Sequence, residues 1–236
     1  MSIFTSRIGK PLEKNEHTEL VVSFNKDILK DFCKYNCADY VIVGTLTPPD
    51  GRKEINGVKG FFYCSEKNRT YHYLDLAYCN DDLKNAKDAF RKTWSQSDKE
   101  SIKKILRERH ILLLDVIDKA YSKIGKSEDK DIMRFTLDYD SFSKIDFSKV
   151  KVVIANSLNA YEALTVISQD KRCQSLRKTF EDKKVFVIPQ QVRGYSSNPS
   201  NNPIKPTYRS DSASSSSKKL EEDWKHFTDR SYLLNR

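Results

Sequence analysis

Four short apolar segments interrupt a chain that is otherwise rich in charged residues. They span residues 39–45, 111–116, 150–155 and 185–188, and Val, Ile or Leu dominates each of them. Continuous apolar runs of this length are typical of strands that are buried on both faces, as in parallel sheets. The pattern therefore predicts four buried strands, the first of them at residues 39–45.

Apolar residues also recur at helical spacing between these runs. The repeats are Leu83, Ala86, Phe90 and Trp94, then Ile102, Ile105 and Leu106, and then the segment 160–167. This spacing places the apolar side chains on one face of each helix. Strands that alternate with helices predict an α/β fold, in which helices cover both faces of a parallel sheet.

Length and local composition indicate how the chain is organised. A chain of 236 residues favours a single domain over residues 1–236, with residues 1–37 as an N-terminal extension. Residues 190–217 are rich in Ser, Asn and Pro and form either a disordered linker or a functional loop. Residues 218–228 again show helical spacing of apolar residues, which predicts a C-terminal helix docked on the core.

The charge balance points to a polyanionic partner. The chain has 42 Lys and Arg against 33 Asp and Glu, a formal net charge of +9. Cations concentrated on one face release counterions when they meet phosphate, so such a surface suits nucleic acid. The sequence shows neither a signal peptide nor a long apolar segment, so we expect a cytoplasmic protein that binds no membrane.

The five cysteines allow two interpretations. Their odd number and irregular spacing suit a reducing compartment. Four of them are candidates for a thiolate cluster site, namely Cys33, Cys37, Cys64 and Cys79. Because no CxxC motif is present, we favour ordinary half-buried thiols and expect no metal.

The residues that follow each apolar run are candidates for chemistry, because open parallel sheets bind ligands at the carboxyl ends of their strands. These residues are Gly44, Thr45 and Thr47, then Asp115, then Asn156 and Ser157, and finally Pro189 and Gln190. They include no glycine-rich dinucleotide motif, phosphate-binding loop, metal-binding His pair or nucleophile elbow. The site is therefore predicted to be polar and to use no cofactor.

Several motifs occur in order along the chain at these predicted strand ends. They are Val-Ile-Val-Gly-Thr-Leu-Thr-Pro (41–48), Phe-Phe-Tyr (61–63), Lys-Asn-Arg-Thr-Tyr (67–71), Leu-Leu-Leu-Asp-Val-Ile (112–117), Gly-Lys-Ser-Glu-Asp-Lys-Asp-Ile (125–132), Ile-Ala-Asn-Ser-Leu-Asn-Ala (154–160), Ile-Pro (188–189) and Ser-Ser-Asn-Pro-Ser (196–200). Together they resemble the uracil-DNA glycosylase superfamily, and most closely its hypoxanthine (deoxyinosine) branch. The resemblance covers residues 38–230.

The resemblance implies both a fold and an activity. The fold is a single-domain αβα sandwich with a central four-stranded parallel sheet. The activity is that of a monofunctional DNA glycosylase, which flips a deaminated or modified base out of DNA and hydrolyses its N-glycosidic bond without a metal or a lyase lysine. We also expect a monomer whose partner is DNA and which needs no obligatory protein partner.

Asn68, Thr45 and Thr47 are the predicted catalytic residues. Asn68 matches the Asn that is thought to position the hydrolytic water in this branch, although it also suits a turn Asn that caps the next helix. Thr45 and Thr47 occupy the turn where uracil-specific enzymes carry Asp or Asn beside the Pro. The usual charged water activator is therefore missing from this turn, and catalysis is either weaker or carried by another residue.

The predicted substrate-binding residues are Gly44, Phe62, Tyr63, Asp115 and Asn156. Phe62 or Tyr63 is expected to stack on the flipped base, unless these aromatics belong to the core. Asp115 stands where uracil-specific enzymes carry a base-reading Asn. A carboxylate accepts hydrogen bonds, so Asp115 favours a base that offers N–H, such as hypoxanthine or a cytosine amino group; the alternative is a helix cap.

Ser127 and Asp129 fit the Gly-Ser-x-Asp pattern of the branch. We interpret them as supporting residues of the site. The alternative is a helix start formed together with Asp131.

The predicted DNA-binding residues are Lys67, Arg69, Arg193, Tyr195, Ser197, Asn198 and Ser200. Arg193 or Tyr195 is expected to fill the gap left by the flipped base, or else to remain solvated. The loop around Arg193 and the segment 52–56 are longer than in the family. These two insertions motivate the hypothesis of a bulky modified cytosine of phage DNA as substrate, which would make the protein a defence enzyme. Removal of ordinary deaminated bases but not of modified cytosine would contradict it.

Two other functions stay open. The missing charge in the Gly44 turn is compatible with an inactive nucleic-acid binding module of the same fold. A small-molecule enzyme or ligand-binding α/β protein is the third candidate. It would bind DNA weakly and with little salt dependence, whereas a glycosylase loses affinity steeply as salt rises.

Overall fold

The computed structural model describes most of the chain up to residue 187. The described residues are 4–8, 10–32, 38–47, 57–58, 60–61, 95–108, 110–126, 129–182 and 184–187. The predicted helix around 83–94, the loop 190–217 and the predicted helix 218–228 lie outside them. In the described part, no helix is long and apolar enough to cross a membrane.

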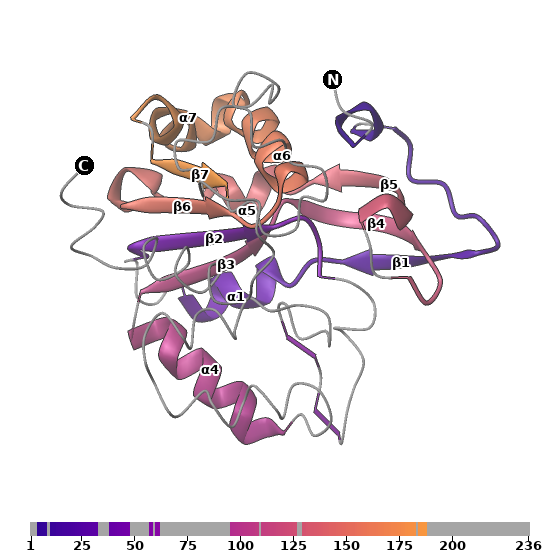
Figure 1. The fold of residues 1–236 in the computed structure, drawn as a ribbon, viewed down its shortest axis with the longest axis horizontal. Coiled ribbons are helices and arrows are strands. Elements are labelled where there is room, and N and C mark those ends of the chain that lie inside the picture. Colours follow the sequence, from indigo (N-terminus) through magenta and orange to yellow (C-terminus); the bar gives the residue numbers. More distant parts are fainter. Residues whose placement is uncertain are drawn as a thin grey trace, which may run out of the picture.

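The four apolar runs form four strands of one sheet (Figure 1). In sequence order the strands are β2 (Tyr40–Gly44), β3 (Ile111–Asp115), β6 (Val152–Ala155) and β7 (Val185–Val187). They are arranged in the order β3-β2-β6-β7, and every neighbouring pair is parallel. The strands themselves were predicted correctly, and the mixed α/β class is confirmed.

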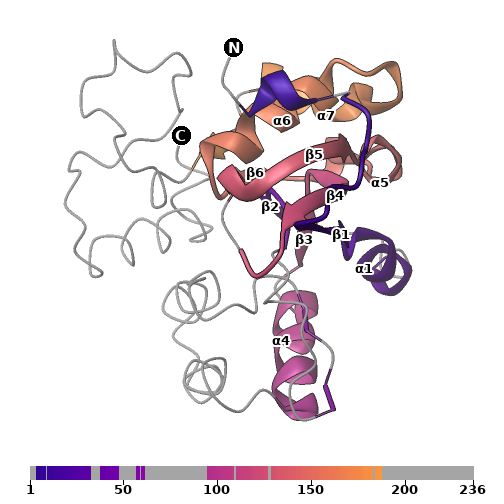
Figure 2. The same ribbon diagram turned by 90° about the vertical axis from the view of Figure 1, so that its right-hand side faces the viewer.

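Helices lie on both sides of these strands. They are α1 (Asn25–Phe32), α4 (Gln96–Glu108), α5 (Tyr139–Ser143), α6 (Leu158–Ser168) and α7 (Gln174–Glu181), with 3-10 turns η1 (Thr5–Arg7), η3 (Asp129–Asp131), η4 (Phe147–Lys149) and η5 (Lys171–Cys173). Figure 2 shows α6 and α7 on one side of the strands and α4 on the other. The sequence predictions at 102–106 and 160–167 correspond to α4 and α6.

A second, antiparallel sheet continues from the end of β3. It contains β1 (Thr18–Val22), β4 (Ile117–Lys123) and β5 (Ile132–Leu137) in the order β1-β4-β5. Only Val116 separates β3 from β4, so the chain passes directly from one sheet into the other. The pattern of apolar residues does not predict this sheet.

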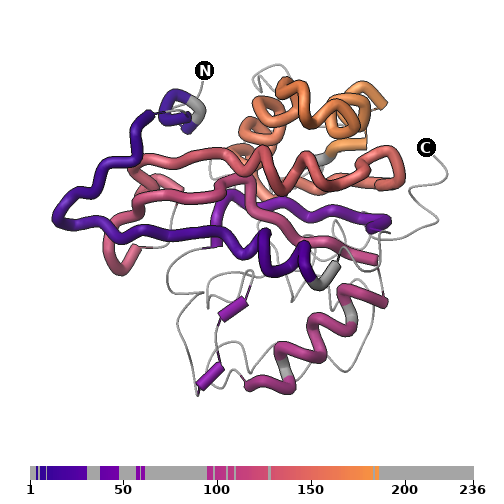
Figure 3. Tube along the Cα trace, turned by 180° about the vertical axis from the view of Figure 1, so that it is seen from behind, coloured from indigo at the N-terminus to yellow at the C-terminus, as the bar shows by residue number. Residues whose placement is uncertain are grey.

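The N-terminal segment takes part in the antiparallel sheet. Figure 3 shows the chain running from η1 to the far end of the antiparallel sheet and turning back there into β1. β1 pairs with β4, Ile8 forms a bridge with Phe135, and the ring of Phe4 stacks on that of Phe135 with centroids 4.8 Å apart. The predicted N-terminal extension therefore supplies an edge strand and part of the core.

The main core lies between the sheet and α6. Alternate residues of a strand point to opposite faces, and Val43 of β2 and Leu114 of β3 belong to the same buried cluster as Leu164 and Ile167 of α6. The opposite face carries Ile42 and Leu113, which pair across β2 and β3 and are both fully buried, and Leu113 lines a pocket together with Leu106 of α4. Burial on both faces explains why these strands have continuous apolar sequences.

Truncation of a leucine in this core should destabilise the protein much more than truncation of an exposed one. Leu164 is fully buried in α6, whereas Leu20 of β1 is 53% exposed. We expect Leu164→Ala to lower the free energy of unfolding by about 2–5 kcal/mol, because it leaves a cavity. Leu20→Ala should cost about 1 kcal/mol or less. Urea denaturation of both variants tests this, and equal losses would contradict the assigned core.

Candidate functional site

The carboxyl ends of β2, β3 and β6 meet at one edge of the parallel sheet. Gly44 pairs with Asp115 across β2 and β3. On the other side of β2, the backbone N–H of Asn156 donates to the carbonyl of Val43 at 2.9 Å. The five predicted site residues within the described part, Gly44, Thr45, Thr47, Asp115 and Asn156, are therefore brought together here.

Thr45 belongs to a cluster of hydrogen-bonded polar side chains, which we call the Asp129 cluster. Its members are Thr45, Asp129, Ser157 and Asn159. The Thr45 hydroxyl donates to Oδ2 of Asp129 at 2.9 Å, and Nδ2 of Asn159 donates to the same oxygen at 2.8 Å. The Thr45 and Ser157 hydroxyl oxygens are 3.2 Å apart. Because Thr45 uses its only proton toward Asp129, Ser157 is the donor in that contact.

Ser157 also fixes the start of α6. Its Oγ accepts the backbone N–H of Ala160 at 3.1 Å, which makes Ser157 the N-cap of the helix. Asn159 lies in the first turn of the same helix. The helix start and the turn after β2 thus hold the carboxylate of Asp129 from two directions.

Asp129 comes from the connection between β4 and β5, where it begins η3. Burial raises the pKa of its carboxyl group, and the hydrogen bonds from Asn159 and Thr45 oppose that rise. No Lys or Arg within the described residues forms an ion pair with it. The structure thus places the Asp129 carboxylate beside Thr45. Thr45 lies in the turn after β2, where residues 45–47 are uncharged.

Asp115 holds the turn after β2 in place. Its Oδ2 accepts the backbone N–H of Thr47 at 3.0 Å, and both residues are fully buried. This hydrogen bond gives the Asp115 carboxylate a structural role. Its predicted role in reading a base stays a prediction.

Asn25 connects the end of β3 to α5. Its Nδ2 donates to the carbonyl of Asp115 at 2.7 Å and to Oδ2 of Asp138 at 2.8 Å, while its Oδ1 accepts the N–H of Asp115 at 2.8 Å. Asp138 in turn caps α5 through the N–H of Ser141. Sequence reasoning missed this residue, because no motif marks a contact between positions 90 and 113 residues apart.

The remaining predicted site residues lie outside the described part of the chain. They are Phe62, Tyr63, Lys67, Asn68, Arg69, Arg193, Tyr195, Ser197, Asn198 and Ser200. Their predicted roles stay predictions. Cys33, Cys37, Cys64 and Cys79 also lie outside it, and the described residues contain no group of three or more His, Cys, Asp or Glu suited to a metal ion.

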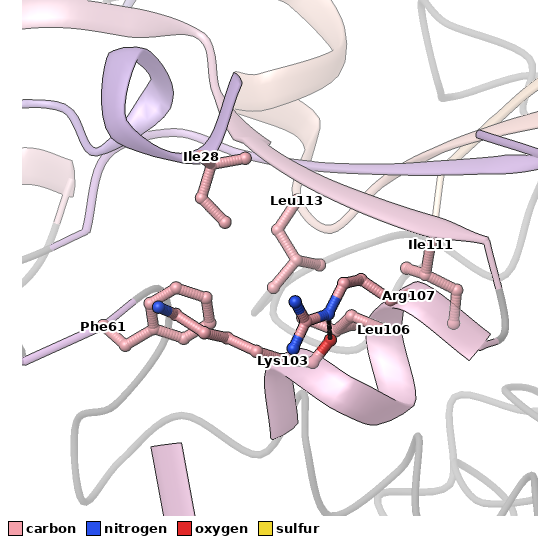
Figure 4. Close-up of a pocket in the computed structure, with 7 residues that line it drawn as sticks. All are labelled: Ile28, Phe61, Lys103, Leu106, Arg107, Ile111 and Leu113. Carbon is pink, nitrogen blue, oxygen red and sulfur yellow. Dashed lines mark hydrogen bonds between the residues drawn. The ribbon is translucent and has the colours of Figure 1, made fainter. Parts of the chain in front are cut away.

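A separate apolar pocket lies between α1, α4 and the first half of β3 (Figure 4). Its lining residues are Ile28, Phe61, Lys103, Leu106, Arg107, Ile111 and Leu113. The walls are mainly hydrocarbon, and the two cations come from α4. It shares no residue with the Asp129 cluster.

Comparison with known proteins yields no relative. No protein-family model, no curated protein and no solved structure matches the chain. Function is therefore inferred from the residues themselves.

Replacing Asn25 by Asp should destabilise the protein in a pH-dependent way. The isosteric carboxylate cannot donate to Asp138 and brings a second negative charge beside it, which we expect to cost about 2–4 kcal/mol near neutral pH. One of the two carboxyl groups should then have a raised pKa, so the deficit should shrink as the pH falls toward about 5.

The matched control is Asn15→Asp. Asn15 is exposed, and its Oδ1 accepts the N–H of His17, which Asp can still do. This variant should change the free energy of unfolding by about 0.5 kcal/mol or less. Equal losses in the two variants, or a deficit for Asn25→Asp that does not change with pH, would contradict the network.

Proposed function

We propose that the protein is a DNA glycosylase that hydrolyses the N-glycosidic bond of a deaminated or modified base. The observation that carries the proposal is the meeting of four separate motif segments at one edge of the sheet. Thr45 comes from the first segment, Asp115 from the second, Asp129 from the Gly-Lys-Ser-Glu-Asp segment, and Ser157 and Asn159 from the segment 154–160. Each of these segments resembles the family in sequence, and the resemblance does not depend on any contact between them.

The chemistry of this edge fits the reaction. Glycosylases hydrogen-bond the edge of a flipped base, and they stabilise a departing base anion and an oxocarbenium-like sugar. Hydroxyl and amide groups supply donors for the base, and a carboxylate opposes the positive charge of the sugar. Asp129 supplies the carboxylate and lies within hydrogen-bonding distance of Thr45 and Asn159. Because the Thr45 proton is used toward Asp129, the donor for a base is the Asn159 amide, which has a second N–H.

We also propose that the overall architecture is the one expected from the family resemblance. The parallel strands β3-β2-β6-β7 with α6 and α7 on one side and α4 on the other support an αβα sandwich with a central four-stranded parallel sheet, as in uracil-DNA glycosylases. The antiparallel sheet β1-β4-β5 is then an addition that delivers Asp129 to the site.

The proposed partner is DNA, and the net charge of +9 supports it. The proposed substrates include bulky modified cytosines of phage DNA, on account of the two loop insertions described above. The inactive DNA-binding module is the second candidate, because the turn after Gly44 has no charged residue of its own.

A glycosylase assay on a panel of modified duplexes tests the proposal. The panel carries uracil, hypoxanthine, xanthine, hydroxymethylcytosine or glucosylated hydroxymethylcytosine, and alkali then cleaves any abasic site. We expect cleavage of at least one duplex, and a fall in rate of about 100-fold or more for Asn68→Ala. Asp115→Asn should also lose rate while keeping an acceptor for the Thr47 N–H.

The matched control is Asp182→Asn, an exposed carboxylate at the end of α7, which should leave the rate unchanged. Intact DNA in every lane, together with DNA binding that weakens steeply with salt, would replace the proposal by the inactive binding module. Weak binding that does not respond to salt would favour a small-molecule function instead.

A further inference from the structure

The missing charge in the Gly44 turn raises the question of what activates water in the proposed reaction. Thr45 and Thr47 are neutral, and a threonine hydroxyl is a poor base at neutral pH. General-base catalysis needs a group that accepts a proton near the operating pH. A carboxylate held beside the turn by another element would meet this need.

We propose that Asp129 is the catalytic carboxylate of the site and that its Oδ1 receives the proton of the hydrolytic water. This inference rests on the proposed glycosylase function and adds a residue to it. Both hydrogen bonds to the carboxylate, from Thr45 and Asn159, go to Oδ2. Among the described residues none goes to Oδ1, which leaves that oxygen as an acceptor for water.

The supports of Asp129 are themselves fixed, so the carboxylate has a defined orientation. Thr45 follows β2 directly, and its carbonyl accepts the N–H of Ile117 at 3.2 Å. Asn159 lies in the first turn of α6, whose N-cap Ser157 contacts Thr45. Groups held in advance in this way lower the barrier, because little reorganisation is needed during the reaction.

The electrostatic surroundings of Asp129 also suit a base. The side chains that bind it from the turn after β2 and from α6 are Thr45 and Asn159, and Ser157 contacts Thr45; all three are uncharged. On its own turn the charged neighbours are Lys130 and Asp131, and from η1 Arg7 donates to the carbonyls of Lys130 and Ile132. Burial raises the pKa of the Asp129 carboxyl group above its ordinary value, and a higher pKa makes a carboxylate a stronger base.

The reaction balances with water as the only co-reactant. As the bond between C1′ and the base nitrogen breaks, its electron pair leaves with the base. The oxygen of water bonds to C1′, and one water proton passes to Oδ1 of Asp129 and then to solvent. The departing base takes up a proton from solvent, so the products are the free base and an abasic site.

Asp129→Asn separates this role from a structural one. The Asn side chain keeps an oxygen for Thr45 and Asn159 but cannot act as a base, so we expect single-turnover cleavage to fall about 100-fold or more. The raised pKa means that ionisation of Asp129 lowers the stability of the folded protein. This loss of stability grows as the pH rises through the folded-state pKa. Asp129→Asn, which cannot ionise, should therefore be at least as thermostable as wild type at pH 8. Asp27→Asn, an exposed change on α1, should alter neither quantity.

The pH profile gives a further readout. Wild-type cleavage should rise with pH as Asp129 loses its proton, and the residual activity of Asp129→Asn should lack this rise. Asp129→Glu should restore part of the activity. If wild type cleaves a duplex of the panel and Asp129→Asn cleaves it equally fast, or retains the same rise with pH, the role of Asp129 is wrong while the glycosylase proposal stands. If wild type cleaves no duplex at all, both are wrong.

Discussion

The parallel pairing of β2 between β3 and β6 is the constraint on which the rest of the structure depends. Its register sets Gly44 opposite Asp115 and Val43 opposite Ala155, so three strands end at the same level. Hydrogen bonds continue this ladder beyond the strands, from Val116 to Gly44 and from Asn156 to Val43. The polar side chains that follow the strands therefore meet at one edge, where helix starts and backbone N–H groups are available to bind them.

Three carboxylates at this edge are held in different ways; Asp115 and Asp138 are buried, and Asp129 is half-buried. Asp115 accepts the N–H of Thr47, and Asp138 accepts donors from Asn25 and Ser141, so both fix neighbouring segments. Asp129 is held through one oxygen by neutral donors and has no ion-pair partner among the described residues. A carboxylate whose ionisation lowers the stability of the folded protein, and which two elements hold in one orientation, is typical of active sites.

The sequence predicted the strands well because β2, β3 and β6 are buried on both faces, which produces continuous apolar runs. It did not predict the antiparallel sheet, because β1 exposes Leu20 and Val22 but buries Thr18 and so lacks clean alternation. The positions of Thr45, Thr47, Asp115 and Asn156 followed from the strand-end rule. The partnership of Thr45 with Asp129 did not, because it joins residues 84 positions apart and depends on how β4 and β5 fold back.

The proposed function requires that DNA binds where β2, β3 and β6 end. Amide NMR spectra of the labelled protein, titrated with a short duplex that carries a stable abasic-site analogue, test it most directly. We expect the largest shift changes among the assigned amides at Thr45, Thr47, Asp115, Asp129 and Asn159, with little change in α7. Changes confined to α7 or to the pocket beside α4, with the strand-end amides unaffected, would contradict it.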